Sequence, residues 1–101
     1  MITCCIRYRV DRKKLPRFEE YAKRWIALIG KLGGRHHGYF LPAEGKSDEA
    51  ICLFSFDSLA AYEEYRKRAA VDPEAQAAVA FGEETGALLD WDRTFYRPVL
   101  D

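Results

Sequence analysis

The sequence predicts an α+β fold of the ferredoxin-like type, with a four-stranded antiparallel sheet and helices on one face of it. The order and type of its segments predict this fold, and its length predicts a single domain. Segments with strand periodicity and segments with helix periodicity follow one another in the order strand, helix, strand, strand, helix pair, strand. The chain has 101 residues, the length of one domain, so we expect a single domain over residues 1–101.

Four segments have the properties of strands. Residues 2–10 alternate between two unlike sets of side chains, and residues 35–41 are short and aromatic. Residues 50–56 are apolar on both faces, which predicts a central strand. Residues 92–99 form the last strand, and Pro98 places it at an edge, where a missing N–H costs no ladder hydrogen bond.

Three segments have the apolar spacing of amphipathic helices. The first helix is expected over residues 13–32, because apolar side chains recur there at spacings of three and four, with Gly33 and Gly34 behind them. The second begins at residue 57 or 58 and ends near residue 71. Asp72 is then the N-cap of a third helix, which runs to about residue 85.

The strands carry more large aromatic residues than one layer packed against the helices needs. An exposed apolar patch of the resulting size is uncommon on a soluble monomer. We therefore expect a homodimer in which the free sheet faces of two copies pack together about a two-fold axis. The rings concerned are Phe54, Phe56, Tyr39 or Phe40, Trp91 and Phe95.

The charge composition argues against several classes of partner. The chain has 16 Lys and Arg against 16 Asp and Glu, so it carries no net field to hold a nucleic acid or an anionic membrane. Its N-terminus has no basic leader followed by a long apolar stretch, and no run approaches the roughly 18 apolar residues of a membrane span. We expect a cytoplasmic protein that binds neither nucleic acid nor membrane.

The cysteines and histidines do not have the spacing of a metal site. Cys4, Cys5 and Cys52 match no zinc pattern, even with the adjacent His36 and His37. We expect reduced thiols that pack as small apolar side chains. The chain has no phosphate-binding loop and no nucleophile elbow, so we expect neither a metal nor a cofactor.

The strand aromatics and an arginine are the candidates for a small-molecule site. Such sites are mostly apolar with few polar anchors, and an arginine beside aromatic rings can stack on them or hold a carboxylate. Plain packing in the core and in the dimer is the competing explanation for most of these rings. The candidate ligand-binding residues are Tyr8, Tyr39, Phe54, Phe56, Trp91 and Arg93.

His36, His37 and Tyr8 are the candidates for proton transfer. Histidine ordinarily titrates near neutral pH, which suits a general acid or base. Adjacent residues of a strand point to opposite faces, so at most one of the two histidines can enter a cavity. The alternative is a histidine that is solvated or bonded to the backbone.

The chain resembles the NIPSNAP family over nearly its whole length. The resemblance is carried by residues 56–66 (FDSLAAYEEYR), residues 72–76 (DPEAQ) and residues 93–99 (RTFYRPV), with the helix through Phe18 and residues 38–40 in the first half. It implies a dimeric α+β barrel, in the superfamily that also holds cofactor-independent monooxygenases and haem-degrading enzymes. It does not imply a particular activity.

The chain departs from the family pattern on two strands. Family members often carry acidic and arginine side chains at positions that resemble Cys4 and Ile6, and a histidine and a tryptophan at those of Cys52 and Phe54. If those polar residues serve a family reaction, this chain lacks some of the side chains that the reaction uses.

Three functions follow as alternatives. The first is a homodimeric barrel that binds a small apolar or aromatic molecule between sheet and helices. The second is a cofactor-independent monooxygenase or isomerase that uses the same cavity. The third is a structural or interaction module whose sheet face serves only dimerisation. A ligand-sized cavity beside Tyr8, His37 or Arg93 favours the first two over the third.

Overall fold

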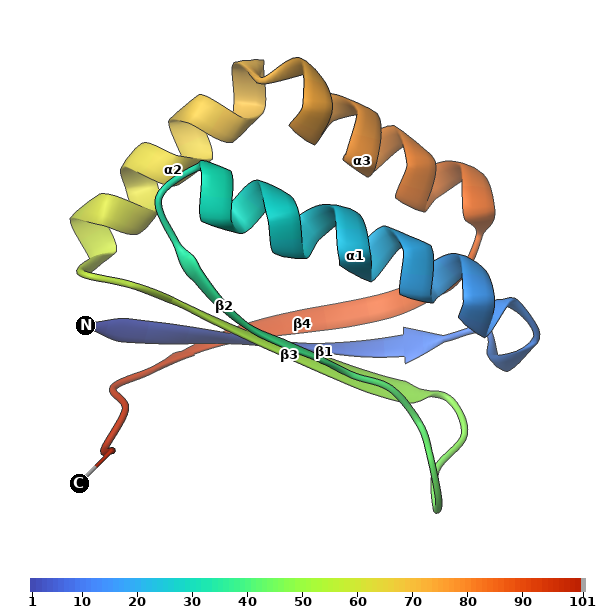
Figure 1. Ribbon diagram of the computed structural model, residues 1–101. Helices are drawn as coiled ribbons and strands as arrows, with labels where there is room; N and C mark the ends of the chain where they lie inside the picture. Colours follow the sequence, from blue (N-terminus) through green and yellow to red (C-terminus); the bar gives the residue numbers. More distant parts are fainter. Residues whose placement is uncertain (101) are drawn as a thin grey trace.

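The computed structural model describes residues 1–100 and contains the predicted elements in the predicted order. The strands form one antiparallel sheet in the order β2-β3-β1-β4, and the three helices cover one of its faces (Figure 1). This confirms the α+β fold class. In chain order the elements are β1 (Ile2–Val10), a 3-10 turn η1 (Arg12–Lys14), α1 (Leu15–Lys31), β2 (Arg35–Phe40), β3 (Glu49–Phe56), α2 (Leu59–Val71), α3 (Pro73–Thr85) and β4 (Leu88–Tyr96).

The last strand begins earlier than the sequence predicted. β4 starts at Leu88 rather than at residue 92, and it ends before Pro98. The early start follows from the end of α3, where Gly86 adopts a left-handed φ of 66° and turns the chain directly into the sheet. A β-bulge opposite Arg9 and Val10 interrupts the alternation of side chains between the two sheet faces at the start of β4. The sequence pattern therefore does not indicate a strand at these residues. β4 is an edge strand, as predicted.

The helices begin and end at the residues that cap them. Asp11 accepts a hydrogen bond from the Lys13 N–H at 3.0 Å, so it caps η1, and α1 starts at Leu15. Gly33, with a φ of 101°, follows the last turn of α1. No helix within residues 1–100 has the length and apolar character needed to cross a membrane.

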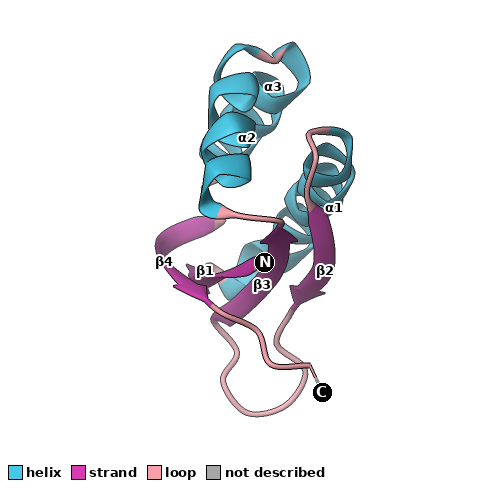
Figure 2. Cartoon of the chain, turned by 90° about the vertical axis from the view of Figure 1, so that its left-hand side faces the viewer, coloured by secondary structure: helices cyan, strands magenta, loops and turns pink. Residues whose placement is uncertain are grey.

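Most of the aromatic strand residues lie on the helix-covered face of the sheet, so the expected surplus of rings on the free face was too large, although Phe40 does lie on that face. Phe54 and Phe56 are 5% and 3% exposed beneath the helices. On β4, Trp91 is paired with Tyr8, and Phe95 lies 4.9 Å from the Tyr62 ring of α2, so both face the helices. Figure 2 shows why one layer can hold these rings, because α1 and the α2–α3 pair stand side by side over different parts of the sheet.

Phe18 holds α1 on the sheet. Its side chain is fully buried, and its ring centroid lies 5.2 Å from that of Tyr8 and 5.9 Å from that of Tyr39, both in edge-to-face geometry. Edge-to-face pairs contribute about 0.5–1.5 kcal/mol each beyond the area that they bury. Phe18 therefore joins α1 to β1 and β2 at the centre of the core.

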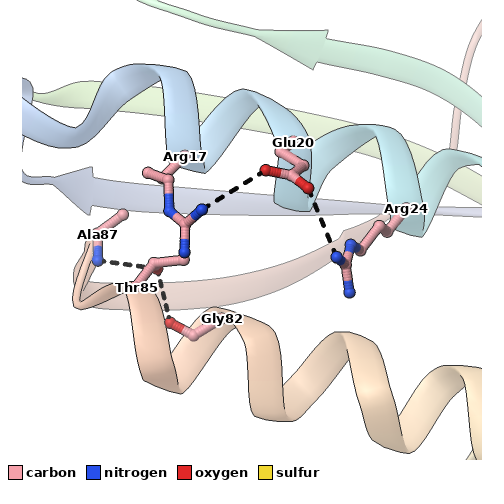
Figure 3. A network of polar contacts seen from close by, with 6 residues as sticks. All are labelled: Arg17, Glu20, Arg24, Gly82, Thr85 and Ala87. Carbon is pink, nitrogen blue, oxygen red and sulfur yellow. Dashed lines mark hydrogen bonds and ion pairs between the residues drawn. The ribbon is translucent and has the colours of Figure 1, made fainter.

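Phe81 of α3 packs against two arginines of α1. The guanidinium of Arg24 lies 3.9 Å from the ring centroid and that of Arg17 lies 5.0 Å from it. Glu20 lies between the arginines, 3.9 Å from Arg17 and 3.5 Å from Arg24, and so orients both (Figure 3). Beside them Thr85 donates to the Gly82 carbonyl and accepts from the Ala87 N–H, which closes the end of α3.

Gly82 allows α3 to approach α1 closely. A Cβ at this position would lie 2.6 Å from the ring of Tyr21, a distance that real Cβ contacts do not reach. The absence of a side chain at Gly82 therefore sets where Tyr21 lies.

The Gly82→Ala variant is expected to unfold at lower urea concentration than the wild type. Displacing the Tyr21 ring costs about 1–3 kcal/mol, which outweighs the gain of about 0.5–1 kcal/mol from replacing a helical glycine. Gly30→Ala is the matched control, because a Cβ there meets nothing within 4 Å and brings only the gain. A Gly82→Ala protein as stable as Gly30→Ala would show that the close approach is not required.

Candidate functional site

A cavity of about 520 Å³ lies between the sheet and the helices. Its size is within the range of small-molecule sites, roughly 300–1,000 Å³. The sheet contributes one side of it and α1, α2 and α3 contribute the other. Trp91 is about half exposed and so lies at an open edge of the cavity.

Most of the side chains predicted for a ligand site line this cavity. Tyr8, Tyr39, Phe54, Trp91 and Arg93 do so. Whether they bind a ligand stays a prediction.

Phe56 is the predicted ligand-binding residue that does not line the cavity. It packs between the Tyr62 and Tyr65 rings of α2, with centroid distances of 5.6 and 5.0 Å. Phe56 therefore supports two rings that do line the cavity, without reaching it itself.

The two histidines point to opposite faces of the sheet. His36 lines the cavity, whereas the His37 Nε2 lies 2.7 Å from the Ser55 hydroxyl on the face without helices. The pairing of β2 with β3 shifts between His36 and Gly38, and Gly38 has a φ of 111°. This bulge fixes which histidine enters the cavity, and the His37 side chain does not line it.

Four aromatic side chains of the helices complete the cavity and were not predicted as site residues. Tyr21 and Trp25 come from α1, and Tyr62 and Tyr65 come from α2. Their spacings of four and three residues place each pair on one helical stripe. The sequence signal was therefore present, but an apolar stripe is normally explained by packing alone.

Burial keeps the tyrosine and cysteine side chains of this layer protonated. It raises the pKa of Tyr21 to about 12 and the pKa values of Tyr8 and Tyr39 well above the ordinary range. It likewise raises the pKa of Cys4 to about 12 and that of Cys52 to about 11. None of these groups is an effective base or nucleophile at neutral pH.

His36 is neutral, and the backbone fixes its tautomer. Burial, and secondarily the charge of His37, lower the pKa of His36 to about 4. The Gly38 N–H donates to the His36 Nδ1 at 2.9 Å, so the ring proton resides on Nε2. The ring is stacked on Tyr39, with centroids 5.0 Å apart and an interplanar angle of 13°.

Two buried N–H groups of cavity residues have no hydrogen-bond partner within residues 1–100. They are the Nε2–H of His36 and the Nε1–H of Trp25. The Tyr21 hydroxyl is near enough to Trp25 for the indole N–H to lower the pKa of Tyr21 against the larger effect of burial, but the two groups do not meet hydrogen-bond geometry. Buried donors are rarely left unpaired in proteins.

Charged groups lie among the lining residues as well. Arg93, Arg66 and Glu83 all contribute to the cavity. Among the residues that the structure describes, Arg93 has no carboxylate within 4 Å, so its guanidinium is available to other acceptors.

The comparison with protein families decides the affiliation of the chain. The family model named NIPSNAP matches residues 4–100. The chain belongs to the NIPSNAP family. Among curated proteins, none was found that matches this NIPSNAP chain.

Solved structures of other proteins share the NIPSNAP fold of this chain. Protein Atu4242 from Agrobacterium tumefaciens is 20% identical, with a TM-score of 0.85 over 98% of this chain and 94% of that one. An uncharacterized NIPSNAP domain protein from Burkholderia xenovorans is 21% identical, with a TM-score of 0.80 over 98% and 95% of the two chains. SnoaB, a cofactor-independent oxygenase from Streptomyces nogalater, is 14% identical, with a TM-score of 0.68 over 99% and 94%.

The four positions at which the sequence is expected to depart from the family pattern all lie under the helices. Cys4, Ile6, Cys52 and Phe54 are between 0% and 6% exposed, and Ile6 and Phe54 line the cavity.

NMR of the histidine side chains is expected to show His36 as the Nε2–H tautomer at neutral pH, with protonation only near pH 4. Because this pKa is below the ordinary value of 6.5, the folded state binds fewer protons than the unfolded state between the two values. The free energy of unfolding therefore falls as the pH drops through this interval. His36→Phe removes that part of the pH dependence and His37→Phe retains it, whereas a His36 that titrates near pH 6.5 contradicts the assignment.

Proposed function

We propose that this NIPSNAP protein binds a small aromatic molecule in the cavity between its sheet and its helices. The observation that carries the proposal is the cavity itself, about 520 Å³ in volume and walled by aromatic side chains of both layers. Rings on opposite walls suit a flat apolar molecule, which they can contact on both faces. A module that used its sheet only for assembly would need no such space.

Catalysis in this cavity is the second candidate function. Its support is the shared fold with an oxygenase, which at 14% identity concerns the architecture alone. Neither His36 nor Tyr8 is suited to remove a proton, because the free nitrogen of His36 carries its proton and burial raises the pKa of Tyr8. Glu83 is the carboxylate among the lining residues, so a proton transfer here would use Glu83. We favour binding over catalysis because neither His36 nor Tyr8 is suited to remove a proton.

Filling the cavity is expected to abolish binding of an aromatic probe. Indane and 1-indanone are suitable probes, because they share one ring skeleton and are small enough for the cavity. Ala69 lines the cavity and its replacement by Phe occupies part of it, whereas Ala60 is exposed on the same helix and does not line it. In amide NMR titrations, Ala69→Phe should weaken binding about tenfold or more, equivalent to roughly 1.4 kcal/mol, and Ala60→Phe should leave it unchanged.

Two results contradict the binding proposal. One is a wild-type protein whose amide spectrum responds to neither probe up to the solubility limit. The other is binding that persists in Ala69→Phe at wild-type affinity, which would place the probe elsewhere.

We also propose that the protein is a homodimer that packs through the sheet face without helices. Cys5, Ile51 and Leu53 form a partly or fully buried apolar centre on this face, and Phe40 and Tyr96 lie about half exposed towards its edges. This apolar strip is smaller than the sequence suggested, because most of the rings face the helices.

The charges of the free sheet face support the same assembly. The β1 and β4 pairing places Arg7 opposite Asp92 and Arg9 opposite Asp90, so a basic row and an acidic row run side by side. Under a two-fold axis the acidic row of one copy can face the basic row of the other. Such complementarity fixes the register of an interface whose centre is apolar.

Leu53→Lys is expected to convert the dimer to a monomer. In sedimentation experiments the wild type should have twice the chain mass of 11.7 kDa and the variant should have that mass once. Burying an unpaired ammonium in an apolar interface costs several kcal/mol. Leu59→Lys is the control, because Leu59 is 57% exposed on α2 and away from this face. A wild-type protein that sediments as a monomer would overturn the dimer.

A further inference from the structure

We propose that the cavity selects aromatic molecules that carry a hydrogen-bond acceptor, such as a ketone oxygen, and that the Nε2–H of His36 or the Nε1–H of Trp25 recognises this acceptor. The inference rests on the proposed binding function and names the chemical class of its ligand. Both donors belong to residues that line the cavity, and both are buried without a partner among residues 1–100.

The backbone of β2 makes the Nε2 atom of His36 a hydrogen-bond donor. The Gly38 N–H occupies the lone pair of Nδ1 at 2.9 Å, which leaves the only ring proton on Nε2. The ring cannot change tautomer without losing this hydrogen bond and placing two N–H groups against each other. Stacking on Tyr39 and contact with Phe54, at 5.0 and 5.7 Å between centroids, hold the ring in one orientation.

Trp25 supplies an N–H group that can act only as a hydrogen-bond donor. The indole N–H can donate but cannot accept, so only an acceptor satisfies it. The neighbouring Tyr21 hydroxyl lies outside hydrogen-bond geometry in this structure. Trp25 is placed on α1 and His36 on β2, so acceptors are recognised from the helix side and from the sheet side of one cavity.

The polar groups of the lining favour acceptors over donors. Arg93 adds guanidinium N–H groups that no carboxylate within residues 1–100 engages. The lining tyrosines do not discriminate, because a hydroxyl both donates and accepts. Glu83 is the carboxylate among the lining residues, and this residue is exposed rather than buried. A hydrocarbon ligand leaves both buried N–H groups unpaired, whereas a ketone can pair with one of them.

The pair of probes tests this selection. 1-Indanone and indane differ by one carbonyl, so their affinity ratio isolates the acceptor. We expect 1-indanone to bind about three- to tenfold more tightly, the gain of one hydrogen bond to a buried donor. In His36→Phe, which keeps an aromatic ring on Tyr39, the ratio should decrease, and in His37→Phe it should not change. Trp25→Phe provides a second reduction that does not depend on the β2 bulge.

The chemical shifts of the two N–H protons provide a second test, which uses the wild-type protein. Hydrogen bonding moves an N–H proton resonance downfield, so 1-indanone should shift the Nε2–H signal of His36 or the indole signal of Trp25, and indane should not. Trp91→Phe assigns the indole signal, since Trp25 and Trp91 are the two tryptophans of the chain.

The outcomes separate this inference from the binding proposal. If neither probe binds, the binding function itself fails. If both bind with equal affinity, the cavity binds aromatic molecules without selecting acceptors, and this inference alone is overturned. If 1-indanone is preferred but the preference survives in both His36→Phe and Trp25→Phe, another group such as Arg93 reads the acceptor and the assignment of the two donors is wrong.

Discussion

The position of α1 above the sheet is the constraint on which the rest of the structure depends. Phe18 is fully buried between α1 and the rings of Tyr8 and Tyr39, so α1 cannot approach the sheet further without a clash. At the same helix, Gly82 of α3 admits the ring of Tyr21, and the Arg17, Glu20 and Arg24 cluster holds Phe81. α1 and α3 are thus joined at this place, aromatic side chains fill the layer beneath them, and the cavity lies between the sheet and the helices.

Burial in this layer favours the neutral form of the tyrosines, of Cys4 and Cys52, and of His36. It raises the pKa values of the tyrosines and thiols and lowers that of His36, so all of them are neutral at physiological pH. A cavity whose buried tyrosines and histidine are neutral, with Arg66, Glu83 and Arg93 as its charged lining residues, is suited to hold an apolar ring and to direct it through a few hydrogen bonds. It is less suited to acid–base catalysis, which needs a group that exchanges protons near neutral pH. This is the physical reason why we propose binding rather than catalysis for this cavity.

The order and type of the elements could be predicted from the sequence, because their signals are local. Asp72 followed by Pro73 marks the start of α3, and Gly33 marks the end of α1. The distribution of rings between the two sheet faces could not be predicted, since both sets of alternating positions contain apolar residues. The choice between His36 and His37 depends on a bulge at Gly38, which has no periodic signature. The helix contribution to the site was missed, because Trp25 and Tyr62 lie on stripes that packing also explains.

The most direct test of the account is a crystal structure of the protein soaked with 5-bromo-1-indanone, in which the bromine can be located by its anomalous scattering. The account predicts one bromine site between the sheet and the helices, with the ketone oxygen within hydrogen-bond distance of His36 Nε2 or Trp25 Nε1. A bromine found only on the free sheet face or at the protein surface would contradict the claim that this cavity is a ligand site.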